Sequence, residues 1–263
     1  MRAFFISCAL TTCAFAQDAS KLAEDPAVKA ALDAAKRNEA HFIDEQVRFC
    51  QIPAPPYKEE IRGKEFESLF KGLGLENVRI DKAGNVIGVR PGAAAHPNLV
   101  FAAHLDTVFP PETDVKVTRD GKILKGPGIG DDCRGLAVML GVIQALKDAD
   151  VKTQGTITFV ADTGEEGLGD LRGTKNLFND SLKDQIDKFI SVDGTGLSIT
   201  NIGVGSYRYR VTFKGPGGHS FSAFGRPSAL VHGRPQMFTH LRFQHLVQHR
   251  VGELRHAINN ATA

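Results

Sequence analysis

The chain has 263 residues, of which 42% are hydrophobic and 24% are charged, a composition typical of globular domains rather than of disordered or fibrous proteins. The length allows one large domain, or one and a half of average size, with a substantial core. The 32 lysines and arginines barely exceed the 30 aspartates and glutamates. We therefore expect no nucleic-acid partner, because the chain has no basic field to bind phosphates.

The N-terminus is predicted to be a signal peptide covering residues 1–16. Arg2 precedes an apolar run that ends in the small-x-small triplet Ala14–Ala16, and cleavage there would start the mature chain near Gln17. We expect a secreted or periplasmic protein with a bacterial-type signal. The run is too short to span a bilayer, so no membrane association beyond the signal is expected. A buried N-terminal helix is the alternative.

The cysteines do not predict a disulfide scaffold. Cleavage of the signal would remove Cys8 and Cys13 and leave only Cys50 and Cys133, too few for such a framework. Cys133 follows an acidic loop, but no neighbouring histidine or basic pair indicates a nucleophile. We expect it to be a packed, unreactive thiol.

Along the rest of the chain, helix and strand patterns alternate, which predicts an α/β fold with a mostly parallel central sheet. In chain order, we predict helices at 26–49 and 58–73, strands at 77–80, 85–89 and 99–103, a helix at 136–146, and strands at 156–161 and 189–192. We expect the last three strands to be buried on both faces.

Each of these three strands runs into polar residues. His104 and Asp106 follow the first strand, Glu165 and Glu166 follow the second, and Asp193 follows the third. Ligands of open α/β sheets bind beyond the carboxyl ends of the strands. We therefore expect these side chains to converge in one site.

The residue types indicate a metal site. One imidazole and several carboxylates form the mixed nitrogen and oxygen ligand set that Zn²⁺ accepts. Asp131 lies in the glycine-rich loop 126–132, where a carboxylate could bridge two metal ions. Asp106 could hold the second ring nitrogen of His104 and so set the orientation of the imidazole.

The adjacent Glu165 and Glu166 are predicted to have different roles, since neighbouring side chains on a loop diverge. Glu166 would bind metal, while Glu165, with a pKa raised by nearby carboxylates, would take a proton from the attacking water. Each motif alone has an ordinary explanation, because a Glu-Glu pair usually starts a solvated helix and the glycine loop is out of register with a dinucleotide fingerprint. Their conjunction carries the prediction.

Four ordered segments resemble a known family. The segments, residues 103–108, 126–132, 163–167 and 191–193, are similar in order and spacing to the co-catalytic zinc exopeptidases, which include aminoacylase, carboxypeptidase G, succinyl-diaminopimelate desuccinylase and tripeptide aminopeptidase. The resemblance covers about residues 42–230. It implies a three-layer catalytic domain, two Zn²⁺ ions, and hydrolysis of a short peptide or an N-acyl amino acid.

The resemblance also assigns roles to individual residues. It implies the following roles: His104 and Asp193 hold one zinc, Glu166 holds the other, Asp131 bridges both, Asp106 orients His104, and Glu165 is the general base. A serine or cysteine hydrolase is disfavoured, since the chain has neither a nucleophile elbow nor a cysteine paired with a histidine.

Residues 206–230 resemble the opening of the small α+β, ferredoxin-like dimerisation domain of that family, following a catalytic domain at 17–205. Residues 207–213 alternate like a strand. His219 matches a histidine that reaches the partner subunit's substrate, so the resemblance implies a substrate-binding role and a homodimer. A histidine satisfied in a turn is the alternative.

The tail, residues 231–263, departs from the family pattern. It contains five of the nine histidines and lacks the expected return to the catalytic domain, where a final histidine would complete the second zinc site. We expect a shortened or out-of-frame end, and therefore weak or absent activity. Two alternatives stay open: a fragment that binds zinc without turnover, and a metal-binding or interaction protein that uses the tail histidines.

Overall fold

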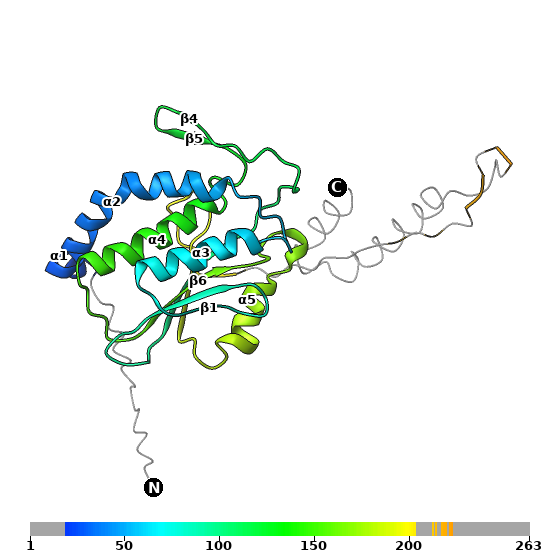
Figure 1. Ribbon diagram of the computed structural model, residues 1–263. Coiled ribbons are helices and arrows are strands. Elements are labelled where there is room, and N and C mark those ends of the chain that lie inside the picture. Colours follow the sequence, from blue (N-terminus) through cyan, green and yellow to red (C-terminus); the bar gives the residue numbers. More distant parts are fainter. Residues whose placement is uncertain (1–18, 204–211, 213, 215–216, 220, 223–263) are drawn as a thin grey trace, which may run out of the picture. The chain divides into compact units, whose positions relative to one another are not determined.

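The computed structural model describes residues 19–203, 212, 214, 217–219, 221 and 222 (Figure 1). The chain divides into two compact units, residues 1–196 and 197–263, which are described separately. The predicted signal peptide and the histidine-rich tail lie outside the described residues, as does most of the strand predicted at 207–213. All the helices and strands described below belong to the first unit, and none of these helices is long and apolar enough to cross a membrane.

The first unit is built on a five-stranded sheet with the order β1-β2-β6-β3-β7. The strands are β1 (Glu76–Ile80), β2 (Val86–Arg90), β3 (Leu99–His104), β6 (Ile157–Asp162) and β7 (Lys188–Ser191). β3 is parallel to both β6 and β7, whereas β2 is antiparallel to β1 and β6. Only β2 therefore runs against the other strands of this sheet, which confirms the mostly parallel α/β fold.

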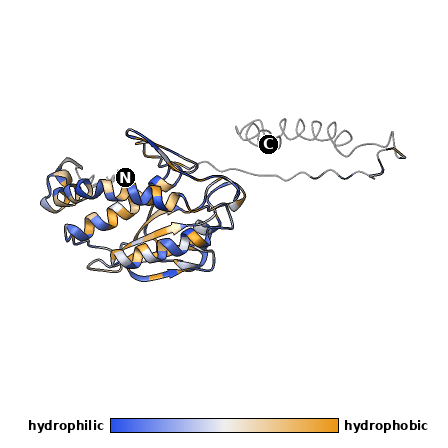
Figure 2. Ribbon diagram, turned by 45° about the horizontal axis from the view of Figure 1, so that its top comes forward, coloured by the Kyte–Doolittle hydropathy of each residue, from blue (hydrophilic) through white to orange (hydrophobic). Residues whose placement is uncertain are grey.

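Helices cover both faces of the sheet (Figure 1). One face carries α2 (Pro26–Cys50), α3 (Glu60–Leu73) and α4 (Cys133–Asp148), and the other carries α5 (Arg172–Asn176) with the π-helical turn Leu177–Ser181. Figure 2 shows mixed hydrophobic and hydrophilic residues along these helices, as expected for elements that bury one side. The remaining elements are α1 (Ala19–Glu24), the hairpin of β4 (Thr118–Asp120) and β5 (Ile123–Lys125), and the 3-10 turn Gly167–Gly169.

Local signals explain the helix boundaries. Asp25 caps α2 by accepting hydrogen bonds from the backbone N–H groups of Ala27 and Val28, and Pro26 occupies the first helical turn. α3 ends at Gly74, whose φ of 85° is a left-handed conformation that glycine adopts without strain. The helices predicted at 26–49, 58–73 and 136–146 therefore correspond to α2, α3 and α4, with shifted ends.

Two of the three strands expected to be buried are buried on both faces. In β3, Val100 and Ala102 pack in the core formed with Leu177 and Leu182, at the π-helical turn that follows α5, while Ala103 packs in the core beneath α2, α3 and α4. β6 divides its side chains in the same way, with Val160 on one face and Phe159 on the other. Apolar residues are favoured at every position of such strands, because neither face meets water.

The expectation that the strand at 189–192 is buried was wrong. β7 pairs only with β3 among the described residues and therefore lies at an edge of the described sheet. Ile190 is 45% exposed. The strand has an apolar sequence, but in the first unit it has a neighbour on one side only, and no described helix buries its outer residues.

The expectation of a free Cys133 thiol was also wrong. Cys50 and Cys133 form a disulfide with their Cα atoms 5.6 Å apart, across 83 residues of sequence. Both residues are fully buried. The bond joins the last residue of α2 to the first residue of α4, directly behind the loop that carries Asp131.

Candidate metal centre

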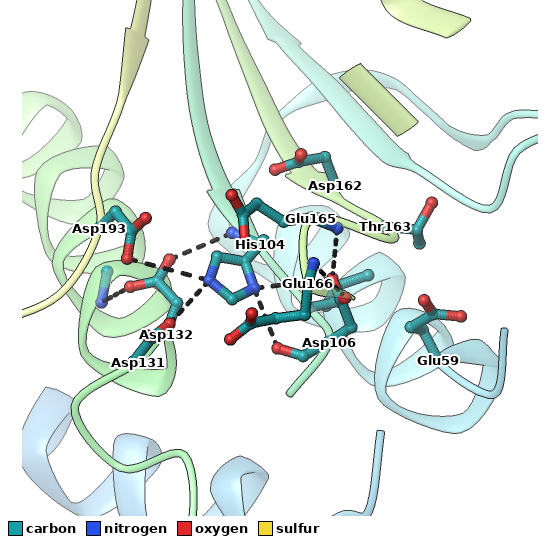
Figure 3. Close-up of polar contacts among 12 residues, drawn as sticks. Glu59, His104, Asp106, Asp131, Asp132, Asp162, Thr163, Glu165, Glu166 and Asp193 are labelled. Atoms are coloured by element: carbon teal, nitrogen blue, oxygen red, sulfur yellow. Dashed lines mark hydrogen bonds and ion pairs between the residues drawn. The ribbon is translucent and has the colours of Figure 1, made fainter. Parts of the chain in front are cut away.

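His104 is the centre of the site. It is the last residue of β3 and is only 2% exposed. Its Nδ1–H donates to the main-chain oxygen of Asp106 at 2.9 Å, and its Nε2 lies 2.9 Å from Oδ1 of Asp131 and 3.9 Å from Oδ1 of Asp193 (Figure 3). One ring nitrogen is therefore held by the backbone, while the other faces carboxylates.

Asp106 connects the two sides of the site. Its carboxylate is fully buried and accepts hydrogen bonds from the backbone N–H of Glu165 at 3.0 Å and of Glu166 at 2.9 Å. It also lies 3.6 Å from Nδ1 of His104. Burial raises the pKa of Asp106, but the nearby imidazole of His104 and the hydrogen bonds from the two amides outweigh it and hold the pKa below its usual range.

Asp131 is positioned by its neighbour Asp132, for which sequence reasoning assigned no role. Asp132 is 1% exposed and caps α4 by accepting from the N–H of Gly135 at 3.0 Å. Its second carboxylate oxygen accepts from the N–H of His104 at 3.1 Å. Burial raises the pKa of Asp132 to about 8. The N-cap thus ties the Asp131 loop to the end of β3, and the local signal was an aspartate preceding a helical pattern.

Glu165 and Glu166 approach His104 from the end of β6. Burial is the largest cause that raises the pKa of Glu165, and the carboxylates of Asp193, Asp106 and Asp131 raise it further. The direction is the one that a general base requires, although burial contributes more than the neighbouring carboxylates that sequence reasoning emphasised. The pKa of Glu166 is raised in the same way, chiefly by burial.

The geometry fits metal binding. Two groups each bring their ligand atoms within 4.8 Å of one another: His104 with Asp131 and Asp193, and His104 with Glu165 and Glu166. Within the described part of the chain, none of these four carboxylates forms an ion pair with lysine or arginine. The site therefore carries an excess of negative charge that a divalent cation would neutralise.

The electrostatics of His104 support the same conclusion. Burial alone would lower the pKa of the imidazole, but hydrogen bonds to Asp106 and Asp131 raise it to about 11. The surrounding carboxylates therefore stabilise a positive charge at the position that Nε2 faces. A proton or a metal ion would supply that charge.

Arg62 holds the backbone next to His104 and was not identified from the sequence. Its guanidinium is 1% exposed and donates to the main-chain oxygens of Leu105, Cys50 and Ile52. Burial lowers its pKa to about 10. Leu105 lies between His104 and Asp106, so the arginine fixes the backbone that presents both. An arginine in a helical pattern suggests a solvated residue, and the sequence contains no signal of this burial.

His219 belongs to the second unit. Its side chain is exposed, and its Nδ1 accepts a hydrogen bond from the N–H of Phe221 at 3.3 Å. This contact is the kind expected of a histidine in a turn. Since the two units are described separately, the predicted contact between His219 and substrate stays a prediction.

Residues 100–231 match peptidase family M20/M25/M40. The chain belongs to this family. Carboxypeptidase G2 from Pseudomonas sp. (strain RS-16) is 31% identical over 164 residues, which cover 58% of this chain and 39% of that protein. A probable succinyl-diaminopimelate desuccinylase from Staphylococcus aureus (strain MSSA476) is 29% identical over 168 residues, which cover 60% and 38%. This member of the family thus spans less than two fifths of the length of these curated relatives.

Solved structures show the same fold. A tripeptidase from Staphylococcus aureus subsp. aureus mu50 has a TM-score of 0.50 and 27% identity, over 60% of this chain and 44% of that one. The dipeptidase Dug1p from Saccharomyces cerevisiae has a TM-score of 0.55 over 77% of this chain and 50% of that one. At 16% identity the second likeness concerns the fold alone.

Proposed function

We propose that this chain is a metal-dependent hydrolase of peptide or N-acyl amide bonds, of the exopeptidase type, that uses two zinc ions. The observation that carries the proposal is the convergence of one imidazole and four carboxylates, with no basic partner among the described residues, beside the carboxyl ends of β3, β6 and β7. Membership of a peptidase family supports the reaction class. The relatives named carboxypeptidase, desuccinylase and tripeptidase indicate a short peptide or an N-acyl amino acid as substrate.

His104 and Asp193 would hold one ion and Glu166 the other, with Asp131 between them. When bound, the ions would polarise the scissile carbonyl and lower the pKa of a water molecule. The side chain of Asp131 is 61% exposed and that of Asp193 is 50% exposed. The ligand side of the site is therefore open to substrate within the first unit.

Glu165 would move the proton. Its raised pKa lets the carboxylate take a proton from water and then deliver it to the departing amine. Asp106 would keep Nδ1 of His104 protonated and hold the backbone of Glu165 and Glu166, because it contacts all three residues. The roles of base and ligand thus fall on adjacent residues held by one buried carboxylate.

The test combines zinc content with hydrolysis. We expect about two zinc ions per chain by elemental analysis, falling to one or none in Asp131→Ala. Glu165→Gln should retain zinc yet hydrolyse N-acyl amino acids and short peptides at least about 100-fold more slowly, since a general base contributes about 10²–10⁴-fold. Asp44→Ala and Glu60→Gln are matched controls, because both residues are exposed and pair with Arg119 and Lys64, which are not residues of the site.

Two results would replace the proposal. Zinc bound without any hydrolysis by the unaltered chain would favour a fragment that binds metal without turnover. Zinc retained in full after His104→Ala would mean that the tail histidines hold the metal, and the chain would then be a metal-binding or interaction protein.

Two further proposals concern the cellular context. We propose export after cleavage near Gln17, which N-terminal sequencing of the secreted protein would test.

We also propose a homodimer formed through residues 206–230. Sedimentation analysis would test it, since a monomer at all concentrations would exclude the dimer.

A further inference from the structure

The connection between α2 and α3 contacts the Glu165 loop, residues 163–171, which carries Glu165 and Glu166. Tyr57, in this connection, donates a hydrogen bond from its hydroxyl to the main-chain oxygen of Leu168 at 3.0 Å. The guanidinium of Arg172 lies over the ring of Tyr57, 4.5 Å from the ring centroid. One exposed aromatic side chain therefore contacts both the middle and the end of this loop.

A partly buried ion pair reinforces this contact. Oε2 of Glu59 lies 2.7 Å from Nη2 of Arg172, and Glu59 is only 4% exposed. The pair joins the residue before α3 to the first residue of α5. Burying two charges costs free energy that one ion pair does not simply recover, so such pairs are weak contributors to stability. Their more informative effect is to define one position for the segments that they join.

Arg172 also packs directly against the backbone that precedes the two glutamates. A Cβ atom at Gly164 would overlap the guanidinium of Arg172, and a Cβ atom at Gly169 would overlap the backbone of Gly164. Gly164 has a φ of 67°, a left-handed conformation suited to glycine. The guanidinium therefore determines where the chain can pass one residue before Glu165.

We propose that Tyr57, Glu59 and Arg172 are positioning residues that set the geometry of Glu165 and Glu166. They would act through the loop, since their contacts are with Leu168, with Gly164 and with one another. Asp106 holds the amides of the two glutamates, and this second group contacts the loop at residues before and after them, Gly164 and Leu168. The inference rests on the proposed function, because it concerns how the Glu166 ligand is presented.

The test is a calorimetric titration of the full metal-free chain with zinc. Glu166→Gln first identifies which binding event depends on Glu166. Glu59→Gln and Arg172→Met should each weaken that event by about 10-fold or more, as loss of a residue supporting a metal ligand commonly does, and leave the event that depends on Asp193 unchanged. Glu60→Gln and Lys71→Met are matched controls, since they change exposed pairs with Lys64 and Glu67 that lie within α3 and do not contact the loop.

A merely structural role would give a different result. If Glu59→Gln and Arg172→Met lower the melting temperature but leave both zinc affinities unchanged, or weaken both events equally, the inference is wrong. Arg172→Lys keeps the charge and should recover part of the affinity. Tyr57→Phe removes one hydroxyl from a side chain that is 65% exposed, so it should fold normally and weaken only the Glu166 event.

The same titration separates this inference from the proposed function. If the unaltered chain binds no zinc, the proposed function fails and the inference falls with it. If the unaltered chain binds zinc through His104 and Glu166 but none of Glu59→Gln, Arg172→Met and Tyr57→Phe affects the Glu166 event, only the inference fails.

Discussion

Two loops supply carboxylates to the candidate site, and they are held in different ways. The Asp131 loop, residues 126–132, is fixed by a disulfide at its end, by the buried carboxylate of Asp132, and by a contact from Nε2 of Gln46 to the main-chain oxygen of Ile129 at 2.7 Å. The Glu165 loop, residues 163–171, is held by the ionised side chains of Asp106, Glu59 and Arg172. Only the first loop should therefore respond to reductant, whereas loss of Asp106, Glu59 or Arg172 should affect the second.

The largest expected effect is on the Glu165 loop. Asp106→Ala removes a fully buried carboxylate that accepts two backbone N–H bonds. Hydrogen bonds to charged groups contribute about 1.5–3 kcal/mol each, so we expect the free energy of unfolding to fall by about 4 kcal/mol. Urea denaturation followed by circular dichroism would measure it, with Asp44→Ala as control. A loss below about 1 kcal/mol would mean that this carboxylate does not hold the loop.

The next effect is on the Asp131 loop. Replacing Cys50 and Cys133 by serine opens a link across 83 residues, which should cost about 3 kcal/mol. Hydrogen exchange should increase in residues 126–135 and stay unchanged in residues 163–171. Equal exchange in both loops would contradict the separate anchoring. A titration of free thiols in the unfolded, unreduced mature chain should find neither cysteine reactive.

The smallest effect concerns pH and the strand that precedes the Glu165 loop. Burial raises the pKa of Asp162 to about 6 in the folded chain, above the value of about 3.9 for an unfolded aspartate. A carboxyl group with a raised folded pKa stabilises the fold below the unfolded pKa, and this contribution is lost as the pH rises through the folded pKa.

The free energy of unfolding should therefore fall by about 2 kcal/mol more in the unaltered chain than in Asp162→Asn between about pH 4 and pH 7. Parallel stability curves for the two proteins would contradict a raised pKa. The amide oxygen that replaces the carboxylate would still accept from the hydroxyl of Thr174, which lies 3.0 Å from Oδ2 of Asp162. The comparison thus isolates the charge from the hydrogen bond.

Much of the fold could be predicted because its signals are local. Apolar runs identified β3 and β6, and helical spacing identified α2, α3 and α4. The exposure of Ile190 in β7 could not be predicted, because an apolar run reports what a strand can bury and not how many neighbours it has. The disulfide was missed for a related reason: Cys50 and Cys133 are remote in sequence and meet only through the packing of α2 and α4.

In the candidate site too, some residues could be predicted from the sequence and others could not. The structure brings together every residue predicted to surround a metal in the first unit, namely His104, Asp106, Asp131, Glu165, Glu166 and Asp193. Their chemical roles stay predictions, as does the contact of His219 with substrate. The supporting residues Arg62, Glu59, Arg172 and Asp132 were not predicted, since a charged residue near a helix start usually faces solvent.

The sequence by itself determined which side chains at the strand ends lie together, because parallel strands deliver their carboxyl ends to one edge of a sheet and the residues that follow each strand lie there. Only the tertiary structure decided how those residues are held. Asp106 reaches the amides of Glu165 and Glu166 across 59 and 60 residues, and Arg172 reaches Glu59 across 113. Contacts at such separations leave no periodic trace in the chain, because they depend on how whole elements pack and not on the spacing within any one of them.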